Sequence, residues 1–195
     1  MAEVPSTFRL ERGAAAPDFT LADGNGNAYS LDRLAAERKA VVIAFVCNHC
    51  PFVIHLADAL GECARQYLAQ GVQFIAISAN DVENYPDDAP DKMAAFAKEH
   101  DWDFPYLYDE TQEVAKAYSA ACTPDFYVFD GDLKLAYAGQ FDSTRPGRGD
   151  DITGEDLRGA IDAVLETGEG PEQPWQPSTG CNIKWKPGSA PDYFG

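Results

Sequence analysis

The sequence predicts an α/β protein whose central sheet is flanked by helices. Residues 40–46 are an unbroken apolar run, and residues 71–78 are a second, largely apolar segment, as expected of strands buried on both faces of a sheet. The segment between them, residues 52–67, places apolar side chains at helical spacing. A strand–helix–strand order of this kind gives parallel strands. A hairpin predicted near residues 126–137 adds antiparallel ones, so the expected sheet is mixed.

A hairpin pattern over residues 17–34 precedes these strands. An alternating strand leads to a Gly/Asn turn, a second short strand and one turn of helix. The turn, Asp23 to Asn27, begins like a calcium-binding loop. However, Ala28 stands where such a loop needs glycine, and Leu34 stands where it needs glutamate. We therefore interpret this segment as a turn.

The second half of the chain continues the alternation of strands and helices. The expected elements are an acidic loop over residues 80–91, a helix capped by Asp91 that runs to about His100, a strand over 104–108, a helix over 110–118, a hairpin of strands 126–129 and 133–137, and a last amphipathic helix over 153–165. Residues 1–168 then form one domain with an N-terminal hairpin extension. Residues 169–195 form an extended Pro/Gly/aromatic tail that packs on the domain or on a neighbouring subunit.

Charge and composition restrict the functional class. The 195 residues carry a formal net charge of −17, which argues against nucleic acid or an anionic membrane as a partner. No segment reaches the length of a membrane-spanning helix, and the first residues lack the basic start and apolar centre of a secretory signal. We therefore expect a cytoplasmic protein, in which paired cysteines more often serve catalysis or metal binding than structure.

The motif with the most chemical content is Cys47-Asn48-His49-Cys50-Pro51, at the predicted junction of a strand and a helix. Two cysteines at this spacing can close and open a disulfide across one turn. The first helical turn offers free backbone N–H groups and the positive end of the helix dipole, which stabilise a thiolate. In this interpretation Cys50 lies one turn inside the helix, and the motif is a redox site.

Three motifs in this order of elements resemble the thioredoxin fold with an N-terminal hairpin, as in peroxiredoxins of the AhpC/TSA type. They are Ala16-Pro17-Asp18-Phe19-Thr20-Leu21 with Ser30-Leu31, the Cys47–Pro51 motif, and Thr123-Pro124 before the strand Phe126–Asp130. The resemblance covers roughly residues 10–167. The tail from Gly180 to Lys186 is similar to that of a subgroup in which a thioredoxin-style CxxC replaces the peroxidatic site.

The two parent families imply different chemistry. The resemblance to thioredoxins makes Cys47 the nucleophile and Cys50 the resolving cysteine. The resemblance to peroxiredoxins aligns the peroxide-cleaving cysteine with Cys50. Such a site also needs a Thr or Ser, a Pro and an Arg, and these positions hold Cys47, Ile43 and about Pro124. Because all three groups are missing, we expect the local chemistry of a dithiol.

Four residues are expected to support the cysteines. Asn48 and His49 lie between them, and Thr123 and Pro124 are expected opposite them with a cis peptide bond, where the backbone of Thr123 pairs with a bound peptide. An imidazole at His49 is expected to stabilise the Cys47 thiolate, which favours the reduced form and predicts a site more oxidising than thioredoxin. The alternative is a solvent-facing, inert His49.

Three further cysteines complete the set. Cys63 falls on the apolar face of the long helix and is interpreted as a core residue. Cys122 stands two residues before the presumed cis-proline and is expected near Cys47. Cys181 lies in the tail, for which no regular element is predicted. Cys122 and Cys181 form a second disulfide, accept the first one in a relay, or stay unpaired.

Three functions compete. The first is a thiol–disulfide oxidoreductase that acts on protein or small-molecule disulfides, is reset by a cellular dithiol donor and uses no cofactor. The second is a thiol peroxidase that uses Cys50 or Cys47. The third is a protein that binds Cu(I) or zinc through Cys47 and Cys50, with His49 and Cys122 as further ligands. The lack of a second CxxC argues against the third, so we expect no metal. A monomer and a homodimer are both compatible with the sequence.

Overall fold

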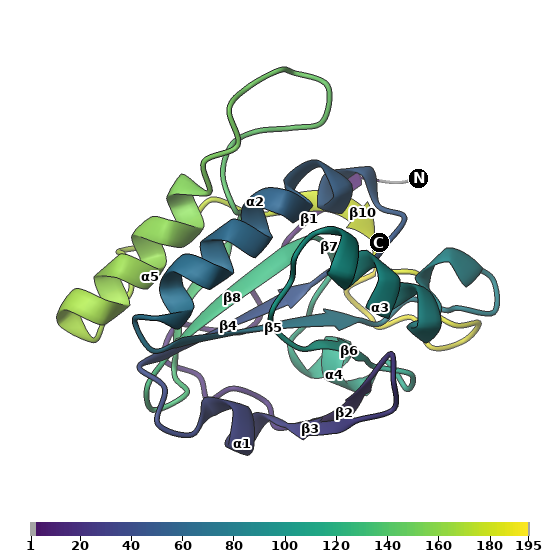
Figure 1. Ribbon diagram of the computed structural model, residues 1–195, viewed down its shortest axis with the longest axis horizontal. Coiled ribbons are helices and arrows are strands. Elements are labelled where there is room, and N and C mark those ends of the chain that lie inside the picture. The colour runs from purple at the N-terminus through teal and green to yellow at the C-terminus, as the bar shows by residue number, and fades with distance from the viewer. Residues whose placement is uncertain (1–2, 195) are drawn as a thin grey trace.

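The computed structural model describes residues 3–194 and has a twisted central sheet with helices packed against it (Figure 1). The strand order is β3-β2-β6-β5-β4-β8-β9. These strands are β2 (Thr20–Asp23), β3 (Ala28–Ser30), β4 (Ala40–Phe45), β5 (Val72–Ser78), β6 (Tyr106–Tyr108), β8 (Asp125–Asp130) and β9 (Leu135–Gly139). The pairs β4–β5 and β5–β6 are parallel and the others antiparallel, which confirms the predicted mixed α/β sheet.

The centre of the sheet is formed by the two apolar runs of the sequence. Every residue of β4 and β5 is buried, because helices or loops cover both faces. Strand β4 lies between β5 and β8, with Phe45 opposite Ile77 on one side and Asp125 on the other. Phe45 is the last residue of β4, so the segment that follows starts at the middle of the sheet edge. That segment carries the two cysteines of the CxxC motif.

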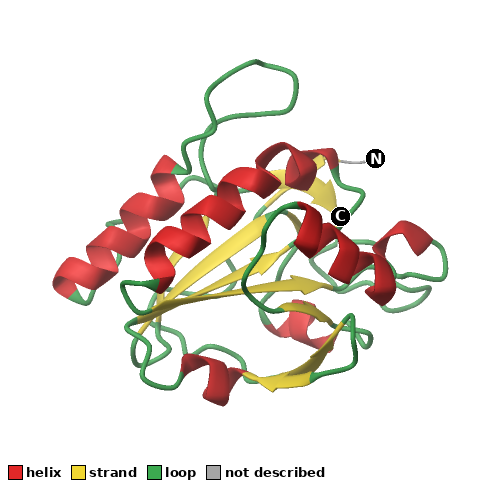
Figure 2. Ribbon diagram, viewed as in Figure 1, coloured by secondary structure: helices red, strands yellow, loops and turns green. Residues whose placement is uncertain are grey.

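Five α-helices surround the sheet (Figure 2). They are α1 (Leu31–Ala35), α2 (Pro51–Leu68), α3 (Pro90–Glu99), α4 (Glu113–Ala117) and α5 (Glu155–Thr167), with a short 3-10 helix at Pro86–Asp88. Helices α2 and α5 lie side by side, and the Tyr67 hydroxyl of α2 donates to Asp162 Oδ1 of α5 at 2.7 Å. Tyr118, which ends α4, packs its ring against Phe45 and Phe129. None of the helices within residues 3–194 is long and apolar enough to cross a membrane.

Three predicted helix starts are wrong. Helix α2 begins at Pro51, so Cys50 is its N-cap residue and does not lie one turn inside it. Proline favours the first helical position because its fixed φ suits the helix and its missing N–H is not needed there. For the same reason α3 begins at Pro90, and Asp91 lies within the first turn without capping it. Helix α4 starts late because Gln112, its N-cap residue, has a left-handed φ of 65°.

The tail contains a strand, which corrects the prediction that it has no regular element. Strand β10 (Thr179–Asn182) pairs antiparallel with β1 (Glu3–Pro5) on one side and with β7 (Cys122–Thr123) on the other. These three strands form a second, small sheet beside the N-terminal end of α2 (Figure 1). Strands of two to four residues have too little alternation to be recognised in the sequence. Only the folded chain brings the three segments together.

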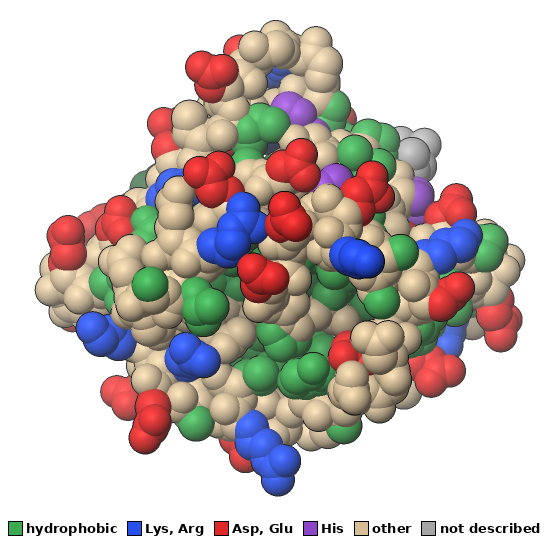
Figure 3. Space-filling view, in the orientation of Figure 1, with side chains coloured by type: hydrophobic (Ala, Val, Ile, Leu, Met, Phe, Trp, Pro, Cys, Tyr) green, Lys and Arg blue, Asp and Glu red, His purple; other side chains and the backbone are tan. Residues whose placement is uncertain are grey.

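The surface explains how the chain carries its negative charge. Aspartate and glutamate side chains are scattered over the face shown in Figure 3 and are not gathered in one patch. Several pair with a basic side chain, as Asp87 does with Lys92 at 2.8 Å.

The close approach of β10 to β7 requires a glycine at position 180. A Cβ atom on Gly180 would lie 2.0 Å from the carbonyl oxygen of Thr123. Gly180→Ala should therefore lower the free energy of unfolding in urea by about 1–3 kcal/mol, because the backbones must separate. Gly159→Ala is the matched control: a Cβ there meets no atom within 4 Å, and alanine within helix α5 should stabilise by about 0.5–1 kcal/mol. Equal stability of the two variants would contradict this packing.

Candidate active site

The two cysteines of the CxxC motif lie opposite the Thr123–Pro124 bond, which is cis as predicted. The Cys47 Sγ atom is 3.5 Å from the Thr123 hydroxyl, and the Cys50 Sγ atom is 3.1 Å from the Thr123 carbonyl oxygen. Both sulfurs are free thiols. The structure therefore brings together Cys47, Cys50, Thr123 and Pro124 from two segments that are far apart in the sequence.

Both thiols are enclosed by the protein. Cys47 is 1% exposed and Cys50 is fully buried. The first turn of α2 contributes no hydrogen bond to sulfur: the N–H groups of Val53 and Ile54 donate to the Cys50 carbonyl oxygen, and the Cys50 side chain makes no capping bond. The expected stabilisation of a thiolate by free N–H groups is thus wrong in detail. What α2 provides is its dipole, whose positive end lies at Cys50 and three residues beyond Cys47.

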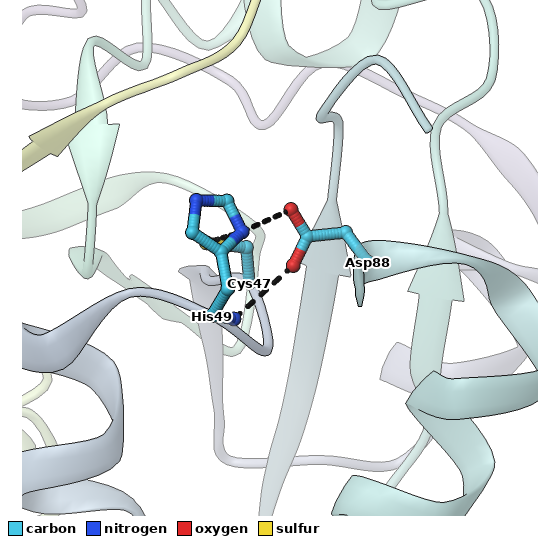
Figure 4. A group of neighbouring side chains, drawn as sticks. All are labelled: Cys47, His49 and Asp88. Atoms are coloured by element: carbon cyan, nitrogen blue, oxygen red, sulfur yellow. Dashed lines mark hydrogen bonds and ion pairs between the residues drawn. The ribbon is translucent and has the colours of Figure 1, made fainter. Parts of the chain in front are cut away.

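The N–H groups of the cysteine loop bind a carboxylate instead. Asp88 is fully buried, and its Oδ1 atom accepts the backbone N–H of Asn48 at 2.8 Å and that of His49 at 3.2 Å. Its Oδ2 atom accepts the side chains of Asn80 at 2.8 Å and His49 at 2.6 Å. Figure 4 shows the His49 ring turned toward this carboxylate, with Cys47 beside it. Asp88 thereby fixes the loop in which the cysteines stand.

Asn48 supports the site through the position of the loop, since its side chain does not contact either sulfur. Its amide nitrogen donates to the Asp87 carbonyl oxygen at 2.9 Å, and its Oδ1 atom accepts the Tyr106 hydroxyl at 2.9 Å. The Asn48 side chain therefore links the cysteine loop to β6 and to the 3-10 helix.

His49 is held by its neighbours and does not face the solvent, so the alternative of an inert surface side chain is wrong. Its Nδ1 atom lies 4.0 Å from Cys47 Sγ, its ring stacks on Tyr85 at 5.7 Å, and its side chain is 18% exposed. The hydrogen bond to Asp88 raises the pKa of His49. The imidazole is thus paired with a carboxylate, which weakens the stabilisation of a Cys47 thiolate that the sequence predicts.

The pKa of Cys50 shifts in the opposite direction from those of Cys47 and Cys181. Hydrogen bonds from the thiols of Cys181 and Cys47 lower the pKa of Cys50 to about 2. The pKa of Cys47 is raised because its thiol donates to Cys50, because it is buried and because the Asp88 carboxylate is near. The hydrogen bond from the Cys181 thiol to Cys50 likewise raises the pKa of Cys181. Among these three cysteines, Cys50 is therefore the one at which a thiolate is most favoured.

Of the remaining cysteines, Cys63 lies in the core and Cys122 faces away from the CxxC pair. Cys63 is fully buried in α2, which confirms it as part of the core. Thr123 points its hydroxyl at Cys47, and successive side chains of a strand point to opposite faces. Cys122 accordingly turns away, and its thiol donates to the Pro124 carbonyl oxygen at 3.5 Å. The expected approach of the Cys122 sulfur to Cys47 is not among the contacts of the described residues.

Cys47, His49 and Asp88 also form a group that could in principle hold a metal ion. One ligand atom from each lies within 4.8 Å of the others. However, the carboxylate oxygens of Asp88 already accept four hydrogen bonds, one of them from His49. A metal at His49 Nδ1 would have to replace the proton in that bond. The donor set fits a hydrogen-bonded network better than a metal centre.

Sequence reasoning missed Asp88, Asn80 and Tyr106. All three lie outside the motifs, and Asp88 is one of several acidic residues in the loop 80–91, which was interpreted only as an acidic connection. No spacing or periodicity distinguishes Asp88 from Asp87, although the first is buried and the second exposed. Their roles depend on contacts between distant segments.

The fold and the paired thiols define a thioredoxin-like redoxin. The family model described as "AhpC/TSA family" matches residues 12–138, and the chain belongs to this family. Among curated proteins, the chloroplastic peroxiredoxin Q of Oryza sativa subsp. japonica is 28% identical over 142 residues. That match covers 68% of this chain and 61% of the rice protein, so the chain matches less than two thirds of that relative's length.

Solved structures agree with this assignment. An uncharacterized conserved protein from Geobacillus kaustophilus is 50% identical with a TM-score of 0.90, and the match covers 96% of this chain and 98% of that one. A secreted disulfide oxidoreductase from Mycobacterium tuberculosis is 20% identical with a TM-score of 0.55, and the match covers 74% and 95% of the two chains. At that identity the second similarity shows the fold alone.

The hydrogen bond from the Cys181 thiol is the largest cause of the low pKa of Cys50. Loss of this thiol should therefore raise the pKa of Cys50. Cys181→Ala should shift the pH profile of Cys50 alkylation by iodoacetamide to higher pH. Cys181→Ser keeps a hydroxyl donor and should shift the profile less, whereas Cys63→Ser, in the core, should leave it unchanged. Alkylated peptides are quantified by mass spectrometry. Identical profiles for wild type and Cys181→Ala would contradict the effect of the Cys181 thiol on the pKa of Cys50.

The raised pKa of His49 predicts a specific pH dependence of stability. Because the folded pKa lies above the unfolded value of about 6.5, the contribution is fully present below that pH. It is lost as the pH rises through the higher folded value. The difference in unfolding free energy between wild type and His49→Asn should therefore be largest in mild acid and shrink in alkali. His55→Asn is a control, since His55 hydrogen-bonds the Thr144 hydroxyl and no carboxylate. A difference that grows with pH would refute the pairing with Asp88.

Proposed function

We propose that the protein is a thiol–disulfide oxidoreductase in which Cys47 is the nucleophile and Cys50 the resolving cysteine. Cys47 attacks one sulfur of a disulfide while its proton passes to the Cys50 thiolate. The first half of the substrate leaves as a thiolate and takes that proton. Cys50, again a thiolate, attacks the mixed disulfide at Cys47, and the second half leaves. The disulfide gains two electrons, and a Cys47–Cys50 disulfide forms.

The placement of both sulfurs against Thr123 is the observation that carries this proposal. Cys47 contacts the Thr123 hydroxyl and Cys50 contacts its carbonyl oxygen, so both sulfurs lie against one residue. A dithiol of this kind can close without rearrangement of the fold. The shared proton between Cys47 and Cys50 also supplies the transfer that the attack needs, without a separate base.

A thiol peroxidase that uses Cys50 is the second candidate. It is favoured by the position of Cys50 at the N-terminus of α2, by its low pKa and by the similarity to peroxiredoxin Q. Against it, no arginine among residues 3–194 hydrogen-bonds to the sulfur of Cys47 or Cys50. A peroxide bound there would lack the cation that stabilises its developing charge.

The same site is the basis for the proposed reduction potential and partners. Stabilisation of a thiolate favours the reduced form, so we place the reduction potential above that of thioredoxin. The partners proposed are protein or small-molecule disulfides and a dithiol donor, in the cytoplasm. Neither a cofactor nor a metal takes part in the exchange.

Parallel assays with hydrogen peroxide and with a disulfide distinguish the two candidates. Reduced wild type should convert glutathione disulfide rapidly and peroxide slowly. Cys47→Ser should lose disulfide reduction, because no nucleophile remains at the first position. Cys50→Ser should trap a mixed disulfide at Cys47, seen as an added glutathione mass on that peptide. Thiols are followed by mass spectrometry under an acid quench.

Cys63→Ser serves as the control, because Cys63 is buried in the core away from the site, and it should behave as wild type. Fast peroxide turnover that depends on Cys50 and persists in Cys47→Ser would overturn the proposal and identify a peroxidase.

A further inference from the structure

The edge at which the thioredoxin resemblance places a bound peptide is already occupied by this chain. Strand β10 pairs antiparallel with β7, with Cys181 opposite Thr123 and Asn182 opposite Cys122. The Ile183 N–H extends the pairing to the Ala121 carbonyl oxygen at 3.1 Å. Strand β10 is itself held on its other side by β1, so it lies in the middle of the small sheet. An external peptide thus finds the backbone of Thr123 paired.

The tail is fitted to this place. Position 180 tolerates only glycine, since a Cβ there would touch the Thr123 carbonyl. Beyond the strand, the Lys184 N–H donates to Asn80 Oδ1 at 2.8 Å, and Asn80 in turn donates to Asp88. The Gln112 amide also donates to the Lys184 carbonyl oxygen at 3.0 Å. The chain just beyond β10 is therefore tied through Asn80 to the carboxylate that holds the cysteine loop.

The pairing delivers a third thiol to the redox site. Cys181 is opposite Thr123, and Cys50 Sγ lies 3.1 Å from the carbonyl oxygen of that same residue. Directly opposite side chains of an antiparallel pair lie on the same face of the sheet, so the Cys181 thiol lies on the face of Thr123 that Cys47 contacts. Cys181 is 3% exposed, so this thiol is enclosed together with the pair. Groups held in such contact react far faster than the same groups free in solution.

We propose that Cys181 is a third redox thiol that takes over the disulfide from Cys47. This step rests on the proposed function, which supplies the Cys47–Cys50 disulfide. The Cys181 sulfur attacks Cys50 Sγ, the bond from Cys50 to Cys47 breaks, and a Cys50–Cys181 disulfide forms. Cys47 leaves as a thiolate and takes up the proton that Cys181 loses. No electron is gained or lost in this exchange, which returns Cys47 to its reactive form.

Cys122 does not share this position, although it is in the same small sheet. Its side chain points to the face opposite that of Thr123, and its thiol donates to the Pro124 carbonyl oxygen. Cys122 is therefore the natural control for Cys181.

Disulfide mapping after oxidation by diamide tests the proposal. Diamide removes two hydrogens from a pair of nearby thiols and needs no activity of the protein, so failure of the proposed function leaves this test intact. Purified Cys47→Ser protein is oxidised, quenched in acid, alkylated, digested and analysed by mass spectrometry. We expect a peptide pair linked through Cys50 and Cys181, its loss in Cys47→Ser/Cys181→Ser, and its retention in Cys47→Ser/Cys122→Ser. Far-ultraviolet circular dichroism verifies that each variant is folded.

Two outcomes would overturn the proposal. One is a folded Cys47→Ser protein in which Cys50 and Cys181 remain alkylatable after diamide has oxidised the Cys47–Cys50 pair of wild type. The other is a link from Cys181 to Cys122. If the expected link forms while wild type fails to reduce glutathione disulfide, the third thiol stands and the proposed function fails.

Discussion

The buried carboxylate of Asp88 is the interaction on which the rest of the site depends. A charge in the interior costs several kcal/mol unless hydrogen bonds replace its water. Here two backbone N–H groups of the cysteine loop, the His49 ring and the Asn80 amide supply those bonds. The loop is thus folded around the carboxylate. The loop held in this way places its two cysteines against Thr123.

Asp88 also explains why the two cysteines differ. Its negative charge and the pairing of His49 disfavour a thiolate at Cys47, whereas the helix dipole and two donor thiols favour one at Cys50. Within the CxxC motif a thiolate is therefore favoured at Cys50 and disfavoured at Cys47.

The C-terminal tail occupies the place where a thioredoxin fold binds a peptide. In an open thioredoxin fold the strand before the cis-proline pairs with a peptide, but here β10 fills that place and is tied through Asn80 to Asp88. Both cysteines are also enclosed. The same strand that restricts access also presents Cys181 to Cys50.

The sequence predicted what is encoded locally. Apolar runs located β4 and β5, helical spacing located α2 and α5, and the CxxC motif with Thr123-Pro124 located the site. Prolines moved the starts of α2 and α3 in ways that composition alone did not indicate. What could not be predicted depends on contacts between distant segments: the pairing of β1, β10 and β7, and the burial of Asp88 among several similar acidic residues.

A redox titration of the purified protein in buffers of oxidised and reduced glutathione at varied ratio tests the central claim most directly. Trapped thiols are mapped by mass spectrometry at each potential. The account predicts one reversible two-electron transition in which Cys50 is always oxidised, with a midpoint more positive than the value of about −270 mV of thioredoxin. A protein in which Cys47 and Cys50 stay reduced across the range, or in which the transition does not involve Cys50, would contradict it.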